Sequence, residues 1–564
     1  MNDKTKTGIE ILQTAILLGI TGDMLLRATP WGLNVFLWVS LLVAAMVAIT
    51  FRRRREHWTP QTMALHGGLV FFSLMYVWRD SLELQILDFL AIITILGLLI
   101  LPSLNMKIHI AGVFHYMAAL CWSGISLAFA PFLLLVEDIK WKTIPSTGFS
   151  KHLVSVLKGL AIAAPILLVF GALFMAADAV FQGIIEKTFN INLEVITTHV
   201  VVISIITWMV AGYLRSSMFK LSPISSGPAA DAKSAAMKDQ VPSVTMHVSE
   251  DPAGNDEKAK KEEAEVKKEK TSTWQDFNNS FLPGFFTLGA VETAIVLGLI
   301  NLLFLSFVII QIPYLFGGIE IVQSTPDFKL AEYARRGFGE LVLVAALVLP
   351  ILLGAHWLLR KDNPMNERLY RILAAIQIGL LFVIMISAAQ RMLLYTGNMG
   401  YGLTAERLYP MVFMIWLAMV FTWFLMTVLR GMRSQFAWGA LWSGLFLLGT
   451  LHVLNPDDFI VRTNIRLMQE GRAFDGYANT RLSDDSVPVL LDSMELMSAN
   501  QRCTVKRKLS RRLAESHQEM DFRSWNYSRW VASSRLAENR PLLDMSTCAE
   551  EFGSRFRQRE LFHR

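Results

Sequence analysis

The sequence predicts an all-α polytopic membrane protein, with about twelve transmembrane helices and a small helical soluble C-terminal domain. Hydrophobic residues make up 53% of the 564 residues and charged residues only 18%, whereas a soluble chain carries about 25% charged residues. Apolar stretches long enough to cross a bilayer as helices recur as far as Leu454. After Leu454 the chain becomes polar and basic.

The apolar stretches set the expected order of the membrane helices. The first follows Lys4 and Lys6 and has no small-x-small cleavage site, so we expect it to be a retained span and not a signal peptide. The expected spans are 8–26, 31–51, 61–78, 82–102, 109–136, 153–175, 195–214, 285–312, 338–359, 368–389, 411–429 and 437–454.

A charged segment, 221–273, separates two groups of spans. It has no apolar periodicity and is rich in Pro, Ser, Ala, Lys and Glu, so it cannot bury enough apolar surface to offset its ordering entropy. We interpret it as a disordered linker, with a regulatory or partner-binding loop as the alternative. The chain then divides into a membrane half at 1–220 (seven spans), the linker at 221–273, a second membrane half at 274–454 (five spans) and a tail at 455–564.

Basic residues at the helix ends indicate the orientation of the second half. Arg215, Arg360, Arg371 and Arg430 all follow or precede spans on one side, which the positive-inside rule assigns to the cytoplasm. The linker is then cytoplasmic and the tail extracytoplasmic.

The positive-inside rule gives conflicting results in the first half if every expected span crosses the membrane. The arginines at 52–55 favour a cytoplasmic position, which puts the N-terminus inside. Five expected spans then separate them from Arg215, and an odd number ends on the wrong side. Either one of the five, with 109–136 as the first candidate, is re-entrant or miscounted, or the arginine block is outside.

The tail is expected to fold into helices at 486–497 and 502–519. Ser483 precedes two aspartates and is a plausible helix cap. Cys503 and Cys548 would be in an oxidising compartment if the tail is outside, and there they could form a disulfide; the alternative is two independent thiols.

Several polar residues should meet at the outer membrane interface if the tail is outside. Glu340 and Arg391 are candidates for an interhelical ion pair. We consider two interpretations: a polar clamp that locks the helices and the tail together, and a site for an anionic ligand or lipid headgroup, since arginines offer forked donors to carboxylate and phosphate. The candidate cluster is Arg335, Arg336, Glu340, Arg391, Tyr401, Arg407, His452, Asp457 and Asp458.

No catalytic signature is present in the sequence. Walker A, HExxH, G-x-S-x-G and dinucleotide-binding patterns are missing, and the three cysteines have no metal-ligand spacing. We therefore predict no catalytic residue, no metal and no cofactor, and we expect a protein that is not an enzyme. The net charge of +6 is explained by topology and anionic headgroups, so we predict no nucleic-acid partner.

Five phrases of the sequence carry a family resemblance when taken in order. They are Ala172-Leu173-Phe174-Met175-Ala176-Ala177-Asp178, Tyr333-Ala334-Arg335-Arg336-Gly337-Phe338 with Glu340, Tyr401-Gly402-Leu403-Thr404 with Arg407, Leu454-Asn455-Pro456-Asp457, and Trp525-Asn526-Tyr527-Ser528-Arg529. Together they resemble bacterial multi-pass membrane proteins grouped as domain of unknown function 4173, close to group 4153. The likeness is best from about 158 to 529 outside the linker, and it implies a bacterial cytoplasmic-membrane location without bringing any catalytic residue.

The function that these observations favour is a non-enzymatic envelope scaffold or sensor. Its partners would be the lipid bilayer and an extracytoplasmic protein or anionic ligand. The alternative is a transporter or lipid-handling protein that uses the outer polar cluster, although the unequal halves of seven and five spans argue against repeat symmetry. A membrane transferase is a third class and would need a catalytic acid facing a cavity.

Overall fold

The fold is that of a computed structural model, which describes residues 2–104, 106–141, 193–219, 287–316, 330–360, 363–393, 396, 402–516, 521–545 and 548. For residues 193–194, 311–316, 330–337 and 516 only the backbone is described. Within these ranges the regular structure is helical, with one isolated bridge between Leu288 and Leu359 and no strand. The all-α prediction is confirmed.

In the part of the chain that the structure describes, the first membrane bundle consists of six helices packed around a shared core. Close approach is possible where α1 crosses α8, because Gly19 has no side chain: a Cβ there would lie 1.9 Å from the Thr207 hydroxyl oxygen. The helices are α1 (Asp3–Leu26), α2 (Leu33–Arg53), α3 (Pro60–Trp78), α4 (Leu82–Leu98), α5 (Val113–Leu133), which continues as the π-helical turn η3 (Leu134–Asp138), and α8 (Leu193–Met218).

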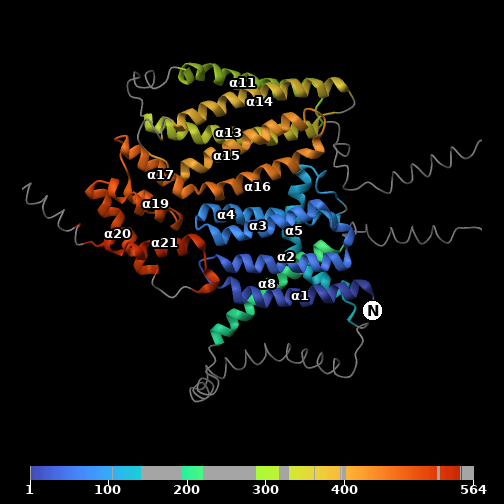
Figure 1. Cartoon of the computed structure of the whole chain (residues 1–564). Helices are drawn as coiled ribbons and strands as arrows, with labels where there is room; N and C mark the ends of the chain where they lie inside the picture. Colours follow the sequence, from blue (N-terminus) through green and yellow to red (C-terminus); the bar gives the residue numbers. More distant parts are fainter. Residues whose placement is uncertain are drawn as a thin grey trace, which may run out of the picture.

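The second bundle lies beside the first, and one helix belongs to both (Figure 1). Phe436 at the start of α16 is part of the second core, whereas Leu445, Leu448 and Leu451 further along it are part of the first. The helices are α11 (Ala290–Phe316), α13 (Leu330–Leu358), α14 (Pro364–Leu393), α15 (Ala405–Thr427) and α16 (Phe436–Leu454).

Ten helices of the described chain are long and apolar enough to cross a membrane. They correspond to ten of the twelve expected spans. The expected span 61–78 is α3, a helix of 19 residues that is not among the ten, since it carries Gln61, His66 and two glycines, but that packs between α2 and α4. The expected span 153–175 lies outside the described residues. The chain is a polytopic helical membrane protein.

The segment formed by α5 and η3 keeps to one half of the first bundle. Gly212, in the last two turns of α8, lies against the backbone of Ser126. Asp138, at the end of η3, pairs with Lys4 at 2.9 Å and with Arg215 at 2.6 Å. These contacts are all in the half where α1 begins and α8 ends.

This placement bears on the count of spans in the first half. Arg52 and Arg53 pair with Glu10, two turns into α1, so the arginine block shares the face on which α1 begins. Arg215 lies on that face too, through Asp138. The expected span 109–136 therefore ends on the face where α1 begins, whereas the expected span 153–175, which the same count includes, lies outside the described residues.

The tail forms a separate helical unit at the other end of the helices from the N-terminus (Figure 1). Asn455, with φ of 54°, ends α16 and caps the next helix, and Pro456 begins it. Its elements are α17 (Pro456–Gln469), α18 (Gly476–Asn479), η9 (Asp484–Ser486), α19 (Val487–Asp492), η10 (Met494–Leu496), α20 (Ala499–Ser516), η11 (Phe522–Ser524), α21 (Tyr527–Glu538) and η12 (Arg540–Leu543).

The tail has its own core, in which Val461, Val487, Val505 and Leu509 are fully buried. The expected helix 486–497 is divided into α19 and η10, and α20 starts three residues before the expected 502. Ser483 does cap η9, where its hydroxyl accepts from the Asp485 amide. A disulfide joins Cys503 to Cys548, with their Cα atoms 5.7 Å apart.

Candidate functional site

A buried carboxylate joins the tail to the end of α3. Asp485 of η9 accepts hydrogen bonds from the Arg79 guanidinium at 3.3 Å, from the backbone amides of Asp80 and Ser81 at 2.8 and 3.1 Å, and from the Ser528 hydroxyl. The Asp485 side chain is fully buried. A buried charge with this many donors is well satisfied, so this contact holds the two parts of the chain in one arrangement.

The start of α21 adds a second set of contacts to the same turn. Asn526 donates to the carbonyl oxygens of Tyr76 and Arg79 at 2.8 and 2.9 Å. Arg529 pairs with Asp80 at 3.1 Å and donates to the carbonyl of Trp31, which lies between α1 and α2. The tail is thus fastened to the ends of α1, α2 and α3 by buried polar groups.

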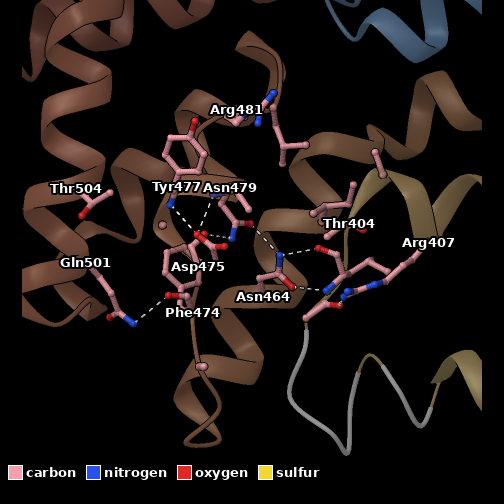
Figure 2. Close-up of a pocket in the computed structure, with 18 of the residues that line it drawn as sticks. Thr404, Arg407, Asn464, Phe474, Asp475, Tyr477, Asn479, Arg481, Gln501 and Thr504 are labelled. Carbon is pink, nitrogen blue, oxygen red and sulfur yellow. Dashed lines mark hydrogen bonds between the residues drawn. The ribbon is translucent and has the colours of Figure 1, made fainter. Parts of the chain in front are cut away.

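A cavity of about 1000 Å³ lies between the tail and the loop that leads into α15; we call it the interface cavity (Figure 2). Asn464 of α17 lies at its centre and holds the loop, because its amide accepts from Leu403 N at 2.6 Å and donates to Leu403 O at 2.9 Å. The same amide nitrogen donates to Asn479 at 2.8 Å. The wall comprises 402–407, 473–479, 481–482, Glu83, Ile460, Asn464, Asn500, Gln501 and Thr504.

The loop side of the interface cavity depends on a glycine. Gly402 has φ of 69°, in the left-handed region, and a Cβ there would lie 2.8 Å from the Asn464 amide oxygen. Arg407 donates back to the Gly402 carbonyl, so its guanidinium lies over the loop. The loop 402–407 therefore lies on one side of the cavity and the tail residues 473–479 on the other (Figure 2).

A second cavity of about 810 Å³ adjoins the first; we call it the acidic cavity. Glu83, Arg481 and Leu482 line both cavities. Its carboxyl groups outnumber its guanidinium groups, five against three: Asp80, Glu83, Asp457, Asp484 and Glu515 against Arg481, Arg512 and Arg529.

Burial perturbs the carboxyl groups of the acidic cavity. It raises the pKa of Asp80 to about 7, with further repulsion from Asp484 and Asp485 and an opposing effect of Arg529. It raises the pKa of Asp457 to about 6, although hydrogen bonds from Ser483 act in the opposite direction. Such shifts mark a place where negative charge is unfavourable at neutral pH, so an anion is a poor match for this cavity.

The expected outer cluster is only partly assembled. Arg407 lines the interface cavity and Asp457 lines the acidic cavity. Glu340 is exposed on α13, and none of the ion pairs given for the described residues joins it to Arg391, so the expected pair stays a prediction. Arg335 and Arg336 lie on α13 with backbone alone described, and Tyr401 lies outside the described residues.

His452 and Asp458 line neither cavity. His452 is fully buried, and its Nε2 lies 2.9 Å from Asp88 Oδ1 of α4. Asp458 pairs with Arg462 one turn along α17. The structure therefore does not bring these two residues to the cavities: sequence gives the depth of a residue on a helix, but the face it occupies depends on packing.

We call the contacts of Asp485, Asn526 and Arg529 with the turn after α3 the joint. Most of the residues that form it were not among the predicted site residues. Arg79, Asp80 and Asp485 were missed because each is an ordinary charged residue near a helix end. The signal available in the sequence was the turn between the spans 61–78 and 82–102. This turn is short and charged, so any segment that packs on it must contact Arg79 or Asp80. Asn526 and Arg529 belonged to one of the phrases that carried the family resemblance.

Within the described part of the chain, no group of three or more His, Cys, Asp or Glu residues is arranged to hold a metal ion. The chemistry that the two cavities offer is hydrogen bonding and charge. This arrangement can bind a polar molecule or hold two parts of the protein together.

Comparison with known proteins identifies the family. The family described as Domain of unknown function (DUF4153) matches residues 66–493, from α3 to the tail. The match covers more than half of the chain, so the chain belongs to this family, which is group 4153; membership of group 4173 is not confirmed. No curated protein matches, and no solved structure does.

Proposed function

We propose that the protein is a non-enzymatic membrane sensor, in which the tail and the membrane bundle enclose a small polar ligand in the interface cavity. The observation that carries this proposal is that the cavity wall comes from both parts, with Asn464 and Asn479 of the tail facing Leu403 and Arg407 of the loop before α15. A ligand that touches both walls would change the free energy of their association, which is what a sensor needs.

We further propose a bacterial cytoplasmic membrane with the tail and both cavities outside. The basic residues support this orientation, since Arg52, Arg53 and Arg215 lie on the face opposite the tail. The disulfide between Cys503 and Cys548 supports it as well, because such bonds persist in oxidising compartments. The linker 221–273 would then be cytoplasmic, and the tail would meet a protein partner or ligand outside.

The sensor proposal is tested with a variant that fills the interface cavity. Thr504→Trp places a large ring in the cavity from α20, and Arg507→Trp places the same ring on the exposed side of that helix. Full-length protein in nanodiscs would be melted with inorganic phosphate, with ethanolamine and with a neutral disaccharide. A probe that stabilises wild type and Arg507→Trp, but not Thr504→Trp, supports the proposal.

Two results together would contradict the sensor proposal. If none of the three probes shifts the melting temperature of wild type, and Thr504→Trp melts no lower than Arg507→Trp, the cavity is a packing gap. The joint around Asp485 would then act as a scaffold alone, which is the clamp interpretation.

Lipid handling is a second candidate, favoured by an apolar cavity of about 520 Å³ between α3 and α16. Its wall includes Gly67, Gly68, Phe71, Phe446 and Gly449, so an acyl chain would meet mainly apolar groups. Gly67→Trp would fill this space, since nothing lies within 4 Å of a Cβ at that position. Native mass spectrometry should then show fewer bound phospholipids per protein than for wild type; equal numbers would exclude this candidate.

A further inference from the structure

Four aromatic side chains are exposed in one short stretch of the tail. Phe522 is 73% exposed, Trp530 50%, Tyr527 45% and Trp525 39%. Tyr527 and Trp530 contact each other, with their ring centroids 6.0 Å apart. We call these four residues the tail aromatic patch. Exposure of so much aromatic surface is unusual for a packed soluble domain, so the patch needs a partner.

The polar residues between these aromatics are turned the other way. Ser524, Asn526, Ser528 and Arg529 are all buried. Ser528 donates to the Trp78 carbonyl at 2.8 Å, at the end of α3. The polar side of this stretch therefore faces the membrane helices and the tail interior, and the aromatic side is left at the surface.

The patch lies at the level where the membrane helices end. The amide of Leu33, the first residue of α2, donates to the Trp525 carbonyl at 2.9 Å. Arg523 donates to the carbonyl of Met24, in the last turn of α1. Met24 is itself 61% exposed, as a side chain that faces lipid would be. The backbone of Trp525 therefore contacts the first residue of a membrane-length helix.

We propose that the tail aromatic patch lies in the lipid headgroup layer on the tail side of the membrane and anchors the tail to lipid. Tryptophan and tyrosine favour this layer because their rings are apolar and polarisable while the indole N–H or hydroxyl remains hydrated. Arg523, next to Phe522 in the chain, contacts the last turn of α1, so lipid around the exposed Met24 of that helix would also reach the patch. The tail is then held by two surfaces, the buried joint at Asp485 and this lipid contact.

The proposal is tested by fluorescence from single positions in full-length protein. Cys121 is the free thiol of the described chain and would be replaced by serine, with the native disulfide kept. Phe522→Cys, Tyr527→Cys and Trp530→Cys would each be labelled with an environment-sensitive fluorophore. Nanodiscs of phosphatidylglycerol and phosphatidylcholine would be used with and without lipids that carry a nitroxide near the headgroup.

The matched control is Arg511→Cys, whose side chain is 75% exposed. It belongs to α20, which lies farther from the membrane helices than α21 does (Figure 1). We expect emission from position 522, and from 527 or 530, to shift to the blue and to lose intensity with nitroxide lipids, while position 511 does neither. Unquenched emission at all three patch positions would overturn the proposal and would assign the patch to a protein partner. Replacement of exposed side chains leaves the core intact, and retention of the disulfide verifies folding.

Discussion

The Asp485 carboxylate accepts a hydrogen bond from the Arg79 guanidinium at 3.3 Å, and this contact joins residues 406 positions apart in the chain. The same carboxylate accepts from the amides of Asp80 and Ser81, so its loss leaves several buried donors without an acceptor. We expect Asp485→Ala to destabilise the tail by about 3–5 kcal/mol. The measurement is thermal unfolding of full-length protein, combined with protease sensitivity of the tail.

The control for this prediction is Asp492→Ala. Asp492 pairs with Arg535, but its side chain is 60% exposed, so water screens the interaction and we expect a cost of about 0–1 kcal/mol. Equal melting temperatures for the Asp485 and Asp492 variants would show that the joint does not hold the tail.

His452 and Asp88 should be coupled in stability. Both side chains are buried, and they link α16 to α4. Removal of one partner leaves the other polar group unpaired in an apolar environment, at a cost of about 3–5 kcal/mol, whereas replacement of both by leucine should cost much less than the sum. A double-mutant cycle of Asp88→Leu and His452→Leu in nanodiscs measures this coupling. Additive effects would contradict it.

Loss of the disulfide should destabilise the tail but not the membrane bundles. The bond between Cys503 and Cys548 closes a loop over a sequence separation of 45 residues, which the chain-entropy model values at roughly 3–4 kcal/mol. Cys503→Ser with Cys548→Ser should lower the melting temperature, and Cys121→Ser should not. Mass mapping of unreduced, alkylated protein gives the direct check, and two alkylated thiols in wild type would refute the bond.

The joint should be more stable in mild acid than at neutral pH. The pKa of Asp80 is raised to about 7 and that of Asp457 to about 6, both above the unfolded value of 3.8. The folded state therefore binds protons more tightly, so this contribution is complete below about pH 4 and is lost as the pH rises through 6 to 7. Thermal unfolding of the tail between pH 5 and 8 would measure it.

The variant that checks this assignment is Asp80→Asn, alone and with Asp457→Asn. An amide cannot ionise, so the fall in melting temperature between pH 5 and 8 should become smaller, most of all in the double variant. A pH profile identical to that of wild type would place the titration elsewhere.

Labelling from outside the cell should reach the tail and not the arginine block. With Cys121 replaced by serine, Leu496→Cys presents an exposed thiol on η10, and Glu56→Cys presents one next to the block at 52–55. A membrane-impermeant maleimide should modify position 496 in spheroplasts and position 56 only after permeabilisation. The reverse pattern would invert the proposed orientation.

Much of the membrane fold follows from local sequence. In lipid a chain must satisfy its own backbone hydrogen bonds, so an apolar stretch of sufficient length becomes a helix whatever its neighbours are. This is why ten of the expected spans have counterparts among the ten membrane-length helices, and why 61–78 also forms a helix as α3. The stop at Asn455-Pro456 was likewise local, because proline begins a helix well and cannot continue one.

The candidate site was predictable only in part. Arg407 and Asp457 lie where the polar termini of helices were expected to meet, because depth along a helix can be read from residue number. The ion pair of Glu340 with Arg391 could not be judged in that way, since it depends on how two helices are rotated about their axes.

The sequence by itself determined the helical membrane class, most of the spans and the division between membrane helices and tail, because these depend on apolar length and on single breaking residues. Only the tertiary structure decided that α5 stays in one half of the bundle, that His452 pairs with Asp88, and that Asp485 accepts a hydrogen bond from Arg79. These relationships join positions far apart in the chain, and their energies depend on burial and on the face each helix presents, neither of which is encoded in any one segment.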